Sequence, residues 1–145
     1  MKLLVLILLS SLMSSSEWLN DFGVAKKTSV EKHELILLNF SGSDWCGPCM
    51  RLHKEIFESD VFKKFAGDYL VLVNADFPRL KKNQLGKEQV KQNELLADKY
   101  NPDGKFPFTV LINAGGKILK TYDGFPGVSA GEFTDEIKAV CNAGK

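Results

Sequence analysis

Cys46 and Cys49 are the residues of this chain whose spacing most directly permits chemistry. Residues i and i+3 of a helix have Cβ atoms about 5–6 Å apart, and a disulfide needs roughly 3.5–4.5 Å, so the pair can close with little distortion. Pro48 suits a first helical turn, where no N–H is required, and Gly47 lets the backbone pass close to a sulfur or a bound peptide. We interpret residues 46–49 as a reversible dithiol/disulfide at the start of a helix.

The position of Cys46 favours a reactive thiolate. It precedes the helix, where unpaired N–H groups and the positive end of the helix dipole stabilise negative charge. Such placement lowers a cysteine pKa from ~8.5 into a range of about 3.5–7.5. We therefore expect Cys46 to be the exposed nucleophile, and Cys49 to be the shielded cysteine that resolves a mixed disulfide.

Other uses of these cysteines have to be weighed. A Cys-x-x-Cys pair is also half of a zinc site, and His53 could supply a third ligand. No fourth ligand is evident in the sequence, and Pro48 with Trp45 suits disulfide chemistry better, so we expect no metal. His53 then either modifies the thiolate or is an ordinary helix residue. Cys141 falls on an apolar helical stripe and is expected to be buried and inert.

Apolar runs on either side of the cysteine pair predict the elements that hold it. Residues 35–40 indicate a buried strand, and residues 69–75 a second one. Between them, residues 50–65 indicate a helix with a break and a new N-cap at Ser59-Asp60. Strand, helix and strand with a crossover of this length predict parallel pairing in a right-handed βαβ unit.

The remaining patterns complete an α/β domain. Residues 17–32 are expected to begin with a helix, and residues 90–100 to form another. Residues 108–112 and 118–122, separated by a glycine-rich turn, predict a hairpin, and residues 133–141 a closing helix. After the preliminary helix the expected order is β-α-β-α-β-β-α. It gives a central mixed sheet of four to five strands with helices on both faces.

The sequence Trp45-Cys-Gly-Pro-Cys49, between a strand and a helix, resembles the thioredoxin family over residues 18 to 142. Residues 40–46 and 76–79 are most similar to exported bacterial thioredoxin-like proteins. The resemblance implies the thioredoxin fold. It also implies thiol–disulfide exchange without a small-molecule cofactor, because the electrons reside in the cysteine pair. Protein disulfides or dithiols are the implied substrates, and a separate redox partner recycles the protein.

The same resemblance suggests a substrate groove. Residues 105–109 match the family segment that carries a cis-proline against the active-site disulfide, so the Phe106–Pro107 bond is expected to be cis. The Phe106 backbone would then pair with an extended substrate segment. Trp45 and Gly124 match a tryptophan and a glycine that flank the family's groove. Simple packing of Trp45 and a turn role for Gly124 are the alternatives.

The chain departs from the family at a position linked to proton transfer. Typical thioredoxins carry a buried aspartate, paired with a lysine on the next strand, that moves a proton for the resolving cysteine. The matching positions here hold Asn39 and Leu72. An amide cannot carry that proton, although Asn39 can be a hydrogen-bonded structural residue. We therefore expect Cys49 to rely on water, or on Asp44, for deprotonation.

Residues 1–16 have the architecture of a signal peptide, with a lysine, an apolar run and small residues. Their apolar run is far shorter than the ~20 residues that span a bilayer. We expect residues 17–145 to form one thioredoxin-like domain that is exported. We expect the protein to lie in the periplasm, and to be tethered to the membrane if the leader is not cleaved.

Composition adds limits on partners. Without Lys2 of the leader, Lys plus Arg falls from 19 to 18 and equals the 18 Asp plus Glu. This balance gives no electrostatic argument for binding nucleic acid or an anionic membrane. The basic loop of residues 76–87 could steer an acidic partner or simply be solvated. Three cysteines are too few for a framework of structural disulfides.

These observations predict an exported, monomeric thiol:disulfide oxidoreductase of protein substrates. Gly47 and Pro48 resemble the pair found in reducing members of the family, which favours the reducing direction. One alternative is an oxidase or isomerase of exported proteins. Another is a peptide-binding or chaperone module around Pro107 with incidental redox activity.

Overall fold

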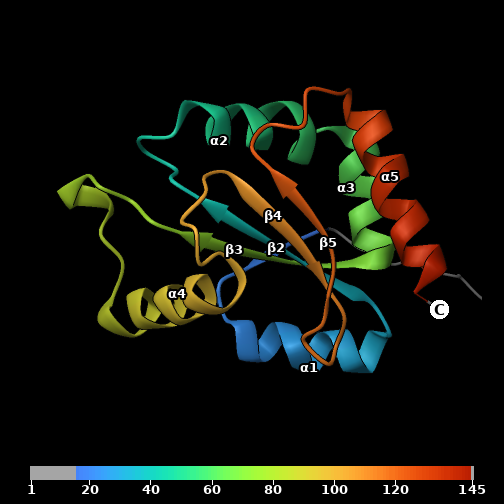
Figure 1. Cartoon of the computed structure of the whole chain (residues 1–145), viewed down its shortest axis with the longest axis horizontal. Helices are drawn as coiled ribbons and strands as arrows, with labels where there is room; N and C mark the ends of the chain where they lie inside the picture. The colour runs from blue at the N-terminus through green and yellow to red at the C-terminus, as the bar shows by residue number, and fades with distance from the viewer. Residues whose placement is uncertain (1–15, 145) are drawn as a thin grey trace, which may run out of the picture.

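The computed structural model of the protein describes residues 16–144, so the predicted leader lies outside the described residues except for its last position. These residues form a five-stranded sheet in the order β1-β3-β2-β4-β5. Helices α2, α3 and α5 cover one face, and α1 and α4 cover the other (Figure 1). No helix within residues 16–144 combines the length and apolarity needed to cross a bilayer. The predicted mixed sheet of four to five strands, with helices on both faces, is confirmed.

The elements follow one another closely along the chain. In order they are β1 (Trp18–Leu19), α1 (Phe22–Lys32), β2 (Leu35–Ser41), α2 (Gly47–Arg51), the π-helical segment η1 (Leu52–Phe57), α3 (Asp60–Tyr69), β3 (Leu70–Asp76), the 3₁₀ turn η2 (Lys81–Asn83), α4 (Lys87–Tyr100), β4 (Phe108–Ile112), β5 (Ile118–Asp123) and α5 (Ala130–Ala143). Strand β3 pairs in parallel with β1 and β2, whereas β4 is antiparallel to β2 and β5. The predicted parallel unit and the predicted hairpin are both present.

The prediction of a helix at the beginning of the domain is wrong for its first residues. Trp18 and Leu19 form strand β1, and the helix begins only at Phe22. The reason is local: the Asp21 carboxylate accepts the Val24 N–H at 3.0 Å and so fixes the N-cap of α1. The apolar spacing that indicated one helix arises from two elements that bury their side chains separately.

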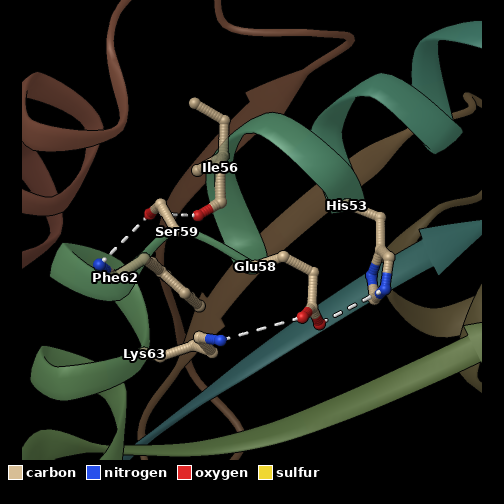
Figure 2. A network of polar contacts seen from close by, with 6 residues as sticks. All are labelled: His53, Ile56, Glu58, Ser59, Phe62 and Lys63. Atoms are coloured by element: carbon tan, nitrogen blue, oxygen red, sulfur yellow. Dashed lines mark hydrogen bonds and ion pairs between the residues drawn. The ribbon is translucent and has the colours of Figure 1, made fainter.

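The helix after the cysteine pair is interrupted where the sequence predicted. Ser59 is the N-cap of α3: its Oγ accepts the Phe62 N–H at 3.3 Å and donates to the Ile56 carbonyl at 2.6 Å (Figure 2). The sequence did not predict that η1, just before this break, is π-helical. Single π turns in α-helices occur frequently at functional sites.

Two apolar layers hold the sheet between the helices. Successive residues of each strand point to opposite faces, so Leu37 and Leu72 enter one layer while Leu38 and Val73 enter the other. The first layer includes side chains from η1, α3 and α5, among them Phe57, which is 1 % exposed. This layer buries η1, which follows directly on the cysteine-bearing helix α2.

Candidate active site

Cys46 and Cys49 are joined by a disulfide, with their Cα atoms 5.2 Å apart. Cys46 is the N-cap of α2, and Pro48 lies in the first turn, as the sequence predicted. The Cys49 N–H donates to the Cys46 Sγ at 3.3 Å. This geometry points a backbone donor at the sulfur that would carry negative charge after reduction.

The expected difference in exposure between the two cysteines is absent in this oxidised form. Cys46 is 5 % exposed and Cys49 3 % exposed. The approach to the pair is nevertheless open. Gly47 and Pro48 are exposed, and a Cβ atom added at Gly47 would meet nothing within 4 Å.

Trp45 is held in place beside the disulfide by contacts on several sides. Its Nε1–H donates to the Phe77 carbonyl at 2.7 Å, and its ring meets the Phe106 ring edge-on with centroids 5.4 Å apart. The Arg79 guanidinium lies 3.7 Å from the ring centroid, a cation–π contact. A Cβ atom at Gly42 would lie only 2.3 Å from the Trp45 ring, so a glycine is needed there. We call Trp45, Phe77, Arg79 and Phe106 the tryptophan platform.

The loop before β4 and the loop after β5 meet at Pro107. The Phe106–Pro107 peptide bond is cis, as expected from the resemblance. The Gly124 N–H donates to the Pro107 carbonyl at 2.9 Å, and Gly124 has φ of 78°, a conformation that favours glycine. An ion pair of 2.8 Å between Lys105 and Asp123 links the loop before β4 to the end of β5. The Phe106 backbone makes no hydrogen bond to any other described residue, which leaves it available to a ligand.

Asp44, which was expected alongside water as a proton acceptor for Cys49, is hydrogen-bonded to the basic loop. Its carboxylate accepts the backbone N–H groups of Arg79 and Leu80, both at 2.9 Å, and the Asn83 side-chain amide at 3.0 Å. These hydrogen bonds, the one from Arg79 first, hold the pKa of the Asp44 carboxyl below its usual value. A carboxylate so engaged is a poor proton acceptor for Cys49. Asp44 instead fastens the basic loop next to the tryptophan platform, a contact that sequence reasoning missed.

Both the nitrogen and the oxygen of the Asn39 amide are hydrogen-bonded to neighbouring strands. Its Nδ2 donates to Asn74 Oδ1 at 3.2 Å, and its Oδ1 accepts from Thr109 Oγ1 at 3.1 Å. Asn74 is its direct partner in the β2–β3 register, while Leu72 is buried in the apolar layer. Neither the Asn74 amide nor the Thr109 hydroxyl can take up a proton near neutral pH. Asn74 and Thr109 were missed because strand register, which the sequence does not reveal, brings them to Asn39.

A cavity of about 310 Å³ lies beside Cys49 and brings several predicted residues together. Its lining consists of Trp18, Asn39, Ser41, Ser43, Cys49, Met50, His53, Phe57 and Asn74. His53 Nε2 lies 3.4 Å from Glu58 Oε1. Cys49, Asn39 and His53 thus line the same cavity.

Two other sequence expectations concern cysteine and metal. Cys141 is buried in the apolar layer on α5, as predicted, at 8 % exposure. Among residues 16–144, no three or more His, Cys, Asp or Glu side chains are grouped to hold a metal ion.

Comparisons with known proteins agree with this geometry. The disulfide bond reductase DsbH of Chlamydia pneumoniae is 37% identical over 124 residues, 86% of this chain and 72% of that protein. The thioredoxin-related protein DsbJ of the same organism is 31% identical over 96 residues, 66% of this chain. The chain spans only 27% of DsbJ. The solved structure of a DsbH oxidoreductase has a TM-score of 0.80 at 34% identity, covering 88% of this chain and 85% of that one.

A family model described as a thioredoxin-like domain matches residues 22–140, which include the disulfide, the cis-proline and all of the sheet except β1. The chain belongs to the thioredoxin-like domain family and is a thiol:disulfide oxidoreductase.

Proposed function

We propose that the protein is an exported reductase of protein disulfides, with Cys46 as nucleophile and Cys49 as resolving cysteine. The observation that carries this proposal is the placement of the Cys46–Cys49 disulfide at an open helix start, beside the tryptophan platform and the cis Phe106–Pro107 segment. The reducing direction is supported by the Gly47-Pro48 pair and by similarity to a protein named a disulfide bond reductase.

The reaction proceeds by two exchanges of sulfur. The Cys46 thiolate attacks a substrate disulfide, so one substrate sulfur leaves as a thiolate and a mixed disulfide forms. Cys49 then loses its proton and attacks the Cys46 sulfur, which closes the intramolecular disulfide and releases the second substrate thiolate. The substrate gains two electrons and two protons in total. A dithiol on a recycling partner returns the Cys46–Cys49 pair to the reduced state.

Local contacts serve each part of this cycle. The Cys49 N–H, 3.3 Å from the Cys46 sulfur, stabilises the attacking thiolate. The free Phe106 backbone can pair with an extended substrate segment, as in strand addition. Trp45 on one side and Gly124 on the other then border the substrate. No small-molecule cofactor is required, because the cysteine pair carries the electrons.

Export is proposed from the pattern of residues 1–16, with the periplasm as the location and a membrane tether if the leader remains. We also propose that the protein acts as a monomer. Oxidation or isomerisation of exported proteins uses the same cysteines and differs in direction. A chaperone module would use the surface around Pro107 without needing either sulfur.

Catalytic reduction of insulin by dithiothreitol tests the activity, since the released B chain precipitates and scatters light. The wild type and Cys141→Ala are expected to accelerate precipitation equally, because Cys141 is buried away from the disulfide. Cys46→Ser should have no catalytic effect, because its hydroxyl is a weak nucleophile toward sulfur. Acceleration that persists in a Cys46→Ser/Cys49→Ser double variant would contradict the proposal. Suppression of aggregation by that variant, without reduction, would favour the chaperone alternative.

A further inference from the structure

We propose that His53, oriented by Glu58, accepts the proton that Cys49 releases when it resolves the mixed disulfide. This inference rests on the proposed function, because it assigns a residue to the second of its two exchanges. Its basis is the cavity of about 310 Å³ that Cys49 and His53 both line. A cavity of this size, with hydroxyl and carboxamide groups in its lining, can hold water, so a proton can pass between the two side chains without direct contact.

The other residues of the cavity cannot take up this proton. Besides Cys49 and His53, the lining consists of aromatic, thioether, hydroxyl and carboxamide side chains. Asn39 stands where the family carries an aspartate, and both ends of its amide are already hydrogen-bonded. Asp44 is occupied by the loop that it fastens. Imidazole, by contrast, is the side chain whose ordinary titration range lies closest to neutral pH.

The contact with Glu58 prepares His53 for this role. His53 Nε2 lies 3.4 Å from Glu58 Oε1, and Glu58 extends between His53 and Lys63 (Figure 2). We assign the proton of the neutral imidazole to Nε2, the nitrogen nearer the carboxylate, which leaves Nδ1 with the lone pair that can accept another proton. The imidazolium formed in this way stays paired with Glu58. Lys63 lies 3.9 Å from the other oxygen of the same carboxylate. Because Lys63 is partly exposed, solvent and salt screen its repulsion of a positively charged imidazole.

The π-helical segment explains why these two residues meet. Side chains five residues apart are not neighbours on an α-helix, where contacts join residues i with i+3 or i+4. At the C-cap of η1 the Glu58 N–H instead donates to the His53 carbonyl at 2.9 Å, an i+5 hydrogen bond that brings the Glu58 side chain close to that of His53. The widened turn thus creates the His53–Glu58 pair directly after the cysteine-bearing helix.

The proposed step is balanced in atoms and charge. The Cys49 S–H bond breaks and its proton moves through cavity water to His53 Nδ1. The Cys49 thiolate forms a bond to the Cys46 sulfur, while the bond from Cys46 to the substrate sulfur breaks. The substrate leaves as a thiolate, and the imidazolium later returns its proton to solvent. His53 is regenerated and no further reactant is consumed.

Ellman's reagent separates the two exchanges in one experiment. When the reduced protein meets one equivalent, Cys46 releases a first coloured thiolate, and Cys49 releases a second as it resolves the mixed disulfide. We expect His53→Gln to leave the first phase unchanged and to slow the second by about 10²-fold at neutral pH, the lower end for general-base catalysis. In His53→Gln, the rate of the second phase should lose the part of its pH dependence that an imidazole base provides. It should then rise only as the Cys49 thiol itself ionises. Glu58→Gln should slow the second phase less, because it disturbs only the orientation of His53.

The matched control is His33→Asn, since His33 is the other histidine of the chain and its left-handed conformation suits asparagine. This variant should behave as the wild type in both phases. Added imidazole should restore the second phase, and not alter the first, in His53→Ala. A His53→Gln variant with an unchanged second phase and pH profile, or with both phases slowed equally, would overturn the inference. A wild type without any first phase would instead contradict the proposed function itself.

Discussion

Replacing Cys49 by serine is expected to convert a turnover catalyst into a protein that stays covalently bound to its substrate. Cys46 can still attack a substrate disulfide, but the neighbouring hydroxyl cannot release the mixed disulfide. The adduct should therefore accumulate to nearly one equivalent, while catalytic reduction falls to the background rate. Intact-mass measurement after incubation with a disulfide-bonded peptide reports the adduct, and peptide mapping places it on Cys46.

The reciprocal variant makes this test decisive, because both cysteines are similarly buried in the oxidised form. Cys46→Ser should form little adduct, since the N-cap position and the backbone donor favour a thiolate at Cys46 and not at Cys49. Both variants are best made in a Cys141→Ala background, so that every adduct reports the active site. Accumulation of adduct on Cys49 in Cys46→Ser, without adduct in Cys49→Ser, would exchange the two roles.

Among the substitutions considered, Phe57→Ala is expected to cause the largest loss of free energy of unfolding. Phe57 is 1 % exposed, and its ring centroid lies 5.0 Å from those of Trp18 and Phe62 and 6.3 Å from that of Phe133. Removing a buried phenylalanine ring leaves a hole that these neighbours fill only in part. The free energy of unfolding should fall by about 3–5 kcal/mol.

Urea denaturation of the oxidised protein, followed by tryptophan fluorescence and circular dichroism, measures this loss. Val61→Ala is a suitable control, because Val61 is 47 % exposed on α3 and its replacement should change stability by no more than about 0.5 kcal/mol. A loss below about 1 kcal/mol in Phe57→Ala would mean that the apolar layer beneath the active site is not packed as described.

The sequence sufficed to predict those features whose causes are local. Cys46 and Cys49 sit at the start of a helix because Gly47 and Pro48 suit that position, and Ser59 marks the helix break because it caps α3. The continuous apolar runs of β2 and β3 likewise predicted strands that are buried on both faces of the sheet. The cis bond before Pro107 was expected from family resemblance rather than from any local pattern.

The features that escaped prediction depend on contacts between distant segments. The Asp44 carboxylate accepts the backbone N–H of Arg79, which is 35 residues away, and neither segment has a sequence pattern that predicts this contact. Trp18 forms a strand because β3 offers a free edge, although its spacing also fits a helix. The π turn at η1 has no proline or glycine to mark it. It aligns His53 with Glu58, and no periodic pattern could have paired those residues.

The reduction potential of the Cys46–Cys49 couple tests the central claim most directly. It can be measured by equilibrating the Cys141→Ala protein with glutathione buffers and quantifying the free thiols by alkylation and mass. A reductase of protein disulfides should have a potential near that of thioredoxin, about −270 mV. A value near that of a strong disulfide oxidant, about −120 mV, would contradict the reducing direction and assign the same site to oxidation.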